Sequence, residues 1–109
     1  MSKYLLIESR DTFEFADVGY FYDLAEGLAR EGHGVTLFLV QNGVLPARPS
    51  ARSERLARLS ESGVAVLADE FSLQERGIPA ASLAKGVRSA GIDRVVDLLA
   101  DGSTRAVWH

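Results

Sequence analysis

Cysteine is absent from this chain of 109 residues. Disulfide bonds, thiolate nucleophiles and zinc or iron–sulfur sites built on cysteine are therefore excluded for the chain acting alone. The absence does not indicate a compartment, because a cysteine-free protein is compatible with both reducing and oxidising surroundings.

The sequence also lacks an excess of positive charge and a long apolar run. Its 12 Lys and Arg against 15 Asp and Glu give a formal net charge of −3, so it has no broad positive field to attract nucleic acid or an anionic membrane. The run from Val35 to Val40 is far shorter than the roughly 20 residues of a membrane span. The segment from Met1 to Tyr4 does not lead into a secretion signal. We therefore expect a cytoplasmic protein that binds neither nucleic acid nor membrane.

Phosphate-binding and metal-binding motifs are missing too. No glycine cluster after a predicted strand has the spacing of a dinucleotide-binding or phosphate-binding loop. His33 lies between two glycines, His109 is the last residue of the sequence, and neither has the spacing of a metal ligand. We expect no metal and no cofactor.

Short apolar runs of strand type recur along the chain. They are rich in β-branched and aliphatic residues and too short for helices of their own. The predicted strands cover 4–7, 35–40, 64–68 and 105–108. The stretch from Leu83 to Arg88 is ambiguous and is compatible with a further short strand centred on Val87.

Helical spacing separates these runs. Asp17 is placed to cap a helix that ends at Gly32, and Ser50 is placed to cap one that ends at Gly63. A short helical piece is expected over 72–76, closed by Gly77, and a last helix from residue 92 or 93 to about Gly102. The alternation of strands and helices predicts a single domain over 1–109, an α/β/α sandwich of three layers around a mainly parallel five-stranded sheet.

In such sheets ligands bind beyond the carboxyl ends of the strands. Polar residues follow three predicted strands at this edge. The candidate crevice residues are Arg10, Asn42, Asp69, Glu70, Ser72 and Arg76.

These residues also have simpler interpretations. Asp69 and Glu70 could share a proton as acid and base, but capping of a helix by Asp69 or Ser72 with a solvated Glu70 explains the pair better. Arg76 is placed to orient the Asp69 loop or to cap its own helix, and Asn42 before glycine is ordinary turn chemistry.

Two more groups are candidates for interactions. Arg48, Arg52, Arg55 and Arg58 form a basic helix edge, which a solvated surface explains better than an acidic partner. Phe13 and Phe15 lie in a polar loop, where they would cover the crevice or pack against another subunit.

The order of these segments resembles the DsrE/DsrF-like family, which includes sulfur-relay subunits of the TusD type. The resemblance is carried by 4–7 with the helix over 17–28, by 35–40 followed by Gln41 to Val44, and by 63–69 leading to Arg76, Gly77 and Ile78. It implies a DsrE-like, flavodoxin-like arrangement of the fold.

In sulfur-carrying relatives a cysteine follows the third strand, and some members have a second cysteine nearby. The resemblance places these positions at Asp69 and Ser72 of this sequence. A carboxylate or a hydroxyl cannot carry a sulfane sulfur as a thiolate does. The resemblance thus implies a family member without carrier chemistry of its own.

Family members form trimers or hexamers, some from paralogous chains of which only one has the reactive cysteine. The leading hypothesis is a non-catalytic subunit, a scaffold or docking component in intracellular sulfur transfer. It would form a homo-oligomer or join a cysteine-bearing paralogue. The alternative is a small-molecule binding protein or enzyme that uses the crevice residues. A flavin carrier is a third option on architecture alone, although the first loop lacks a phosphate-binding Ser/Thr run.

Overall fold

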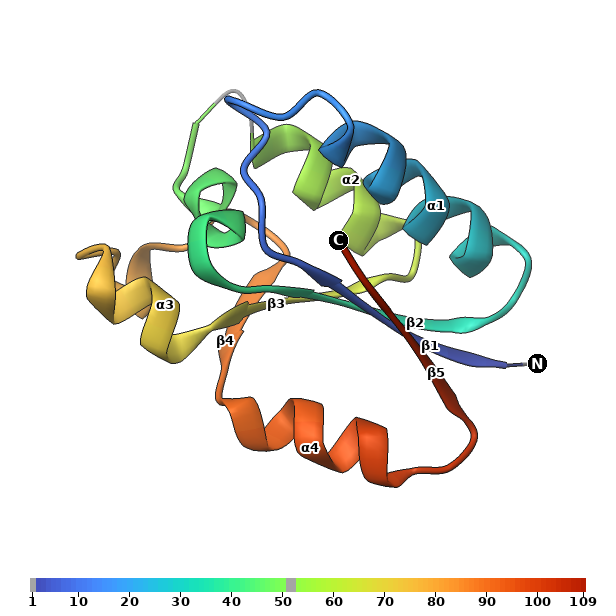
Figure 1. The fold of residues 1–109 in the computed structure, drawn as a ribbon. Coiled ribbons are helices and arrows are strands. Elements are labelled where there is room, and N and C mark those ends of the chain that lie inside the picture. The colour runs from blue at the N-terminus through green and yellow to red at the C-terminus, as the bar shows by residue number, and fades with distance from the viewer. Residues whose placement is uncertain (1, 51–52) are drawn as a thin grey trace.

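The computed structural model describes residues 2–50 and 53–109, and over them the chain forms a five-stranded sheet (Figure 1). The strand order is β4-β3-β2-β1-β5, and every neighbouring pair is parallel. The predicted α/β fold class is confirmed. The strands are β1 (Lys3–Glu8), β2 (Gly34–Leu39), β3 (Ala65–Asp69), β4 (Val87–Ala90) and β5 (Thr104–Trp108).

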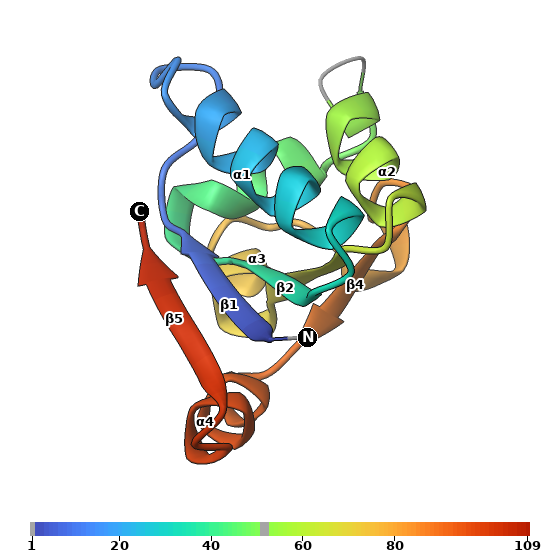
Figure 2. The same ribbon diagram turned by 90° about the vertical axis from the view of Figure 1, so that its right-hand side faces the viewer.

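Helices cover both faces of the sheet, as Figures 1 and 2 show. Helices α1 (Val18–Arg30) and α2 (Glu54–Glu61) lie on one face, and α4 (Ile92–Ala100) lies on the other. The short helix α3 (Glu70–Glu75) and the 3-10 helix η1 (Gln41–Ala47) lie beyond the carboxyl ends of β3 and β2. A second short 3-10 helix, η3 (Ala80–Ser82), follows α3.

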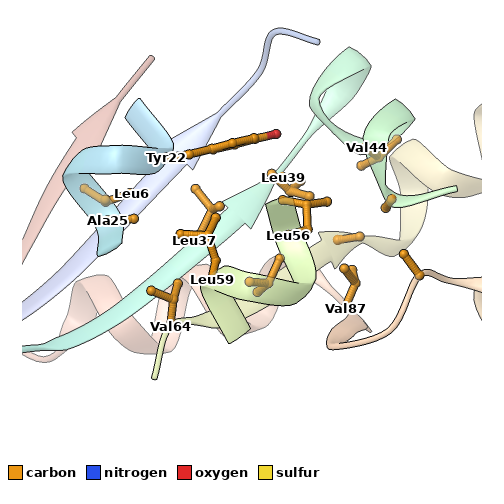
Figure 3. Packing of buried hydrophobic residues seen from close by; sticks show 14 of the residues in the cluster. Leu6, Tyr22, Ala25, Leu37, Leu39, Val44, Leu56, Leu59, Val64 and Val87 are labelled. Carbon is orange, nitrogen blue, oxygen red and sulfur yellow. The ribbon is translucent and has the colours of Figure 1, made fainter. Parts of the chain in front are cut away.

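The core has two parts, one on each face. The larger part lies under α1 and α2 and contains Leu6, Tyr22, Leu37 and Leu59 (Figure 3). The smaller part lies under α4 and is formed by Leu5, Ile7, Phe38 and Val95. Successive residues of a strand point to opposite faces, so a strand buried on both faces has a continuous apolar run. This is why the 4–7 and 35–40 runs identify central strands.

Two expected helix starts are wrong. Helix α2 begins at Glu54 with Ser53, not Ser50, at its N-cap. Ser50 is instead hydrogen-bonded to Ser53: the Ser53 hydroxyl donates to the Ser50 carbonyl at 2.6 Å, and the Ser50 amide donates to the Ser53 hydroxyl at 3.1 Å. Helix α3 begins at Glu70, two residues earlier than expected, since Asp69 is its cap.

Asp17 takes the N-cap position of α1 but does not cap it with its side chain. The carboxylate instead lies 3.0 Å from Nε2 of His109. A long-range partner has replaced the local hydrogen bond that the sequence predicts.

The segment expected to be a polar turn, Gln41 to Gly43, is the start of η1. Gly43 packs against the end of β1 so closely that a Cβ atom there would overlap the carbonyl oxygen of Glu8. Only glycine fits this approach, which holds η1 over the carboxyl ends of the strands.

Candidate functional site

Asp69 ends β3 and caps α3. Its Oδ2 accepts hydrogen bonds from the Ser72 amide at 3.0 Å and from the Ser72 hydroxyl at 2.6 Å. The Ser72 hydroxyl in turn accepts from the amide of Gln41 at 2.8 Å. Asp69 is 8% exposed and Ser72 is 3% exposed. The Asp69 carboxylate is therefore a buried structural acceptor that joins β3, α3 and η1.

Arg76, at the other end of α3, binds residues of the same group. Its Nε donates to Oδ1 of Asn42 at 3.1 Å, and its Nη1 donates to the Ser72 carbonyl at 3.1 Å. The arginine thus orients the loop and binds its own helix at once, the two structural roles that the sequence indicates. Asn42, Asp69, Ser72 and Arg76 form one connected group, which we call the β3–α3 cluster.

The other two crevice candidates lie outside the β3–α3 cluster. Cζ of Arg10 lies 5.2 Å from the ring centre of Phe15, and its Nη1 lies 3.7 Å from Oδ2 of Asp17. Glu70 is exposed and lines a separate cavity with Leu73 and Gln74. Among the interactions of residues 2–50 and 53–109, none joins the carboxylates of Glu70 and Asp69. An acid–base pair of these two groups has no geometric support there.

A second polar cluster, which sequence reasoning missed, lies at the carboxyl ends of β1 and β5. Glu8 is 0% exposed, and its Oε1 lies 2.7 Å from Nδ1 of His109. Its Oε2 accepts from the amide of Arg10 at 3.0 Å. The His109 ring stacks on Phe21 with 5.1 Å between the ring centres. The pairing of β1 with β5 places Ile7 beside Trp108, and the His109 amide donates to the Ile7 carbonyl while the Ser9 amide donates to the His109 carbonyl. No local pattern in the sequence indicates this pairing.

The titration of this pair follows from its surroundings. Burial raises the pKa of Glu8, and the hydrogen bonds that it accepts oppose this shift. The hydrogen bond to Glu8 raises the pKa of His109, although burial opposes the shift. Both imidazole nitrogens contact carboxylates, those of Glu8 and Asp17. The ring therefore links the end of β5 to the end of β1 and to the residue before α1.

The arginines near α2 do not form one basic face. Arg55 pairs with Asp23 at 2.7 Å and with Glu26 at 3.2 Å, which joins α2 to α1. Arg48 lies over the ring of Phe13, Arg58 is exposed, and Arg52 lies outside the described residues. The interpretation as a solvated edge is wrong for Arg55.

Phe13 and Phe15 are partly exposed in the loop before α1. Each lies beneath an arginine, Phe13 under Arg48 and Phe15 under Arg10. These contacts with arginines of the same chain account for the positions of both rings without a contact to another subunit.

Residues 2–50 and 53–109 contain no group of three or more His, Asp or Glu that could hold a metal ion. None of the helices within them is long and apolar enough to cross a bilayer.

No curated protein matches the sequence. Among the solved structures that match, two cover 100% of this chain and are themselves covered over 100% of their length. They are the protein of unknown function MTH1491 from Methanobacterium thermoautotrophicum, with 18% identity and a TM-score of 0.86, and the ychN protein from E. coli, with 17% identity and a TM-score of 0.84. At this identity they show the fold alone. The model of the DsrE/DsrF-like family matches residues 7–105, and the chain belongs to that family.

Proposed function

We propose that this chain is a subunit of a DsrE-like oligomer that has no sulfur-carrier group of its own and acts as a scaffold or docking component. Its partners are further copies of itself, in a trimer or hexamer, or a cysteine-bearing paralogue. The process is intracellular sulfur transfer in the cytoplasm, where thiols are kept reduced. Family membership supports the general setting.

The proposal depends mainly on the burial and the hydrogen bonds of Asp69. The family resemblance aligns this residue with the carrier cysteine, which must present a nucleophilic, accessible sulfur. Here the position holds a buried carboxylate whose Oδ2 accepts two hydrogen bonds from Ser72. A group used in this way stabilises the α3 loop and has no capacity to bind sulfane sulfur.

The surface of α4 and β5 supports an oligomer. Ile92, Val96 and Leu99 follow one another at helical spacing and are 62%, 58% and 51% exposed. Trp108, 66% exposed, lies on β5 beside Ile7, whose side chain packs on the α4 face of the sheet. We call these four residues the α4–β5 patch. Figure 2 shows β5 at the edge of the sheet, where it begins beside α4 and runs away from that helix toward the C-terminus.

An exposed sheet edge with apolar neighbours favours association with another chain. In a trimer the patch of one copy would contact a different surface of the next copy, because contact between two identical patches closes a dimer. The polar Asp69 loop lies at the carboxyl ends of the strands. It adjoins one end of the patch, because Asp69 is paired with Ala90 and Ile92 begins α4 two residues later.

Co-purification tests the proposal. The tagged chain should be recovered from its source lysate in a complex with untagged copies or with a DsrE/DsrF-like chain that has the carrier cysteine. Val96→Asp should lose this complex, because it places a charge in the patch. The control Leu24→Asp changes a similarly exposed leucine on α1 and should retain it. Recovery of the wild-type chain as a free monomer, or sulfur uptake by the purified chain itself, would contradict the proposal.

The alternative is a small-molecule binding protein or enzyme at the strand ends. It is supported by the β3–α3 cluster, which brings the Arg76 guanidinium and the Asn42 amide together at the crevice. Under this alternative Arg76→Ala weakens ligand binding while the protein stays folded. Unchanged binding of candidate ligands by that variant would contradict this alternative.

A further inference from the structure

Strand β5 is the edge of the sheet on the side away from β4. Among the described residues it pairs with β1 alone, and its side chains from Arg105 to Trp108 are all exposed. Figure 2 shows the strand with none of the described helices or strands along its outer side. Val107 is 41% exposed and Trp108 is 66% exposed. An apolar edge strand of this kind is a template for pairing with another chain.

The backbone of β5 directs hydrogen-bonding groups toward this outer side. Both backbone groups of His109 bind β1 or the residue after it, the amide through the Ile7 carbonyl at 2.8 Å. Every second residue of a parallel strand bonds to the same neighbour, so the backbone groups of Val107 also face β1. Ala106 and Trp108 each direct an amide and a carbonyl away from the sheet.

The other edge of the sheet is better protected than β5. Strand β4 has only four residues, one of which is the exposed Arg88, and the exposed Lys85 precedes it. Short length and charged side chains are the usual protection of an edge strand. The only charged residue of β5 is Arg105, near its amino end, and the strand has no proline. The fold therefore leaves β5 as the edge suited to pairing.

We propose that β5 pairs antiparallel with β5 of a second copy across a twofold axis at Val107, so that two five-stranded sheets join edge to edge. The inference rests on the proposed oligomer and names its twofold contact. Contact between identical edges closes a dimer. A homo-oligomer with this contact is then a hexamer of three such dimers, not a trimer, and the α4 residues of the α4–β5 patch supply the contact between dimers.

The apolar side chains favour this register. With the two Val107 residues opposite each other, the outward groups of Ala106 bond to those of Trp108 in the second copy. The small Ala106 side chain then lies beside the large Trp108 ring, since both are on the α4 face of the sheet. Val107 meets its copy on the α1 face, where it lies beside Leu6. Apolar side chains are thus paired across both faces.

The charged and bonded groups disfavour the neighbouring registers. In the proposed register Arg105 lies beside His109 of the second copy, whose ring is 3.0 Å from the Asp17 carboxylate. A register centred on Ala106 would need the Thr104 amide, which already donates to the carbonyl of the loop before β5 at 3.0 Å. A register centred on Arg105 would place two arginines opposite each other, and like charges in that position are destabilising.

Single cysteines test the register, because the chain has none of its own. In Val107→Cys the two thiols face each other in a non-hydrogen-bonded pair, whose Cα atoms are about 4.5 Å apart, a separation that a disulfide spans. The oxidant diamide should link this variant into a dimer about tenfold faster than the control Arg105→Cys, whose two thiols lie about 13 Å apart along the strands.

A second substitution tests the backbone pairing. Ala106→Pro removes an outward amide and leaves the bonds to β1 intact. Added to Val107→Cys, it should lower the rate of cross-linking to that of Arg105→Cys. If Ala106→Pro does not fold, Val107→Lys replaces it. Val107→Lys alone should lose the contact, and an equal mixture with Val107→Glu should restore it, because opposite charges then meet at the axis.

The pairing is overturned if Val107→Cys is linked no faster than Arg105→Cys. It is also overturned if folded Ala106→Pro leaves the cross-linking unchanged, or if the lysine and glutamate variants do not associate when mixed. The native mass of the wild type separates this inference from the proposed function. A wild-type trimer refutes the twofold pairing and leaves the scaffold role standing, whereas a monomer that recovers no partner refutes the scaffold role.

Discussion

Nδ1 of His109 lies 2.7 Å from Oε1 of Glu8, and this contact joins the end of β5 to the end of β1. Glu8 is fully buried, while the other ring nitrogen lies 3.0 Å from Oδ2 of Asp17 before α1. One imidazole therefore links an edge strand, a central strand and a helix start. The stability of the edge strand then depends on the protonation of this ring.

The melting temperature should fall as the pH rises from about 6 to about 8.5. The contact with Glu8 raises the pKa of His109 above its ordinary value of 6.5. The stabilisation is fully present below 6.5 and is lost as the pH rises through the higher pKa of the folded state. The raised pKa of Glu8 acts in the same direction above 4.5, because ionisation of this buried group disfavours folding.

Calorimetric scans across this pH range provide the measurement. His109→Gln should flatten the decline, because the titrating ring is removed. His33→Gln removes the other histidine, which contacts the amide of Ser2 at the opposite end of β1, and should leave the decline in place. A melting temperature that rises over the range would show that the sign is wrong.

Asp69→Ala should destabilise the fold by about 1–2 kcal/mol, the usual effect of losing a helix N-cap. The substitution leaves the Ser72 amide without its acceptor, 3.0 Å away in the wild type. Asp69→Asn retains an acceptor oxygen and should lower the free energy of unfolding by a smaller amount. Urea unfolding of the three proteins measures the difference, and equal midpoints would show that the Asp69 carboxylate is not a structural cap.

Gly43→Ala should destabilise the chain by about 1–3 kcal/mol, because the added methyl group meets the Glu8 carbonyl and forces η1 away from β1. Gly27→Ala is the matched control. Gly27 lies within α1 and has open space around its would-be Cβ atom, so alanine there should stabilise by about 0.5–1 kcal/mol. Thermal unfolding of both variants checks the opposite signs, and a neutral Gly43→Ala would refute the close approach.

The succession of strands and helices could be predicted from the sequence, because each element has its own periodicity. The capping by Asp69 could also be predicted, since its partner Ser72 is three residues away. The contact of Glu8 with His109 spans 101 positions. It depends on β5 pairing with β1 rather than with β4, a choice that no local pattern encodes.

The start of η1 could not be predicted from a local sequence pattern either. Asn42 with Gly43 has the composition of an ordinary turn, but the Ser72 hydroxyl binds the Gln41 amide from 31 positions away.

Native mass spectrometry of the purified wild-type chain tests the central claim most directly. The subunit has a mass of 11.8 kDa, and the account predicts that the dominant species is a trimer or hexamer of it, or a defined complex with a cysteine-bearing homologue. A single 11.8 kDa species at micromolar concentration, from a preparation in which no partner has been removed, would contradict the account.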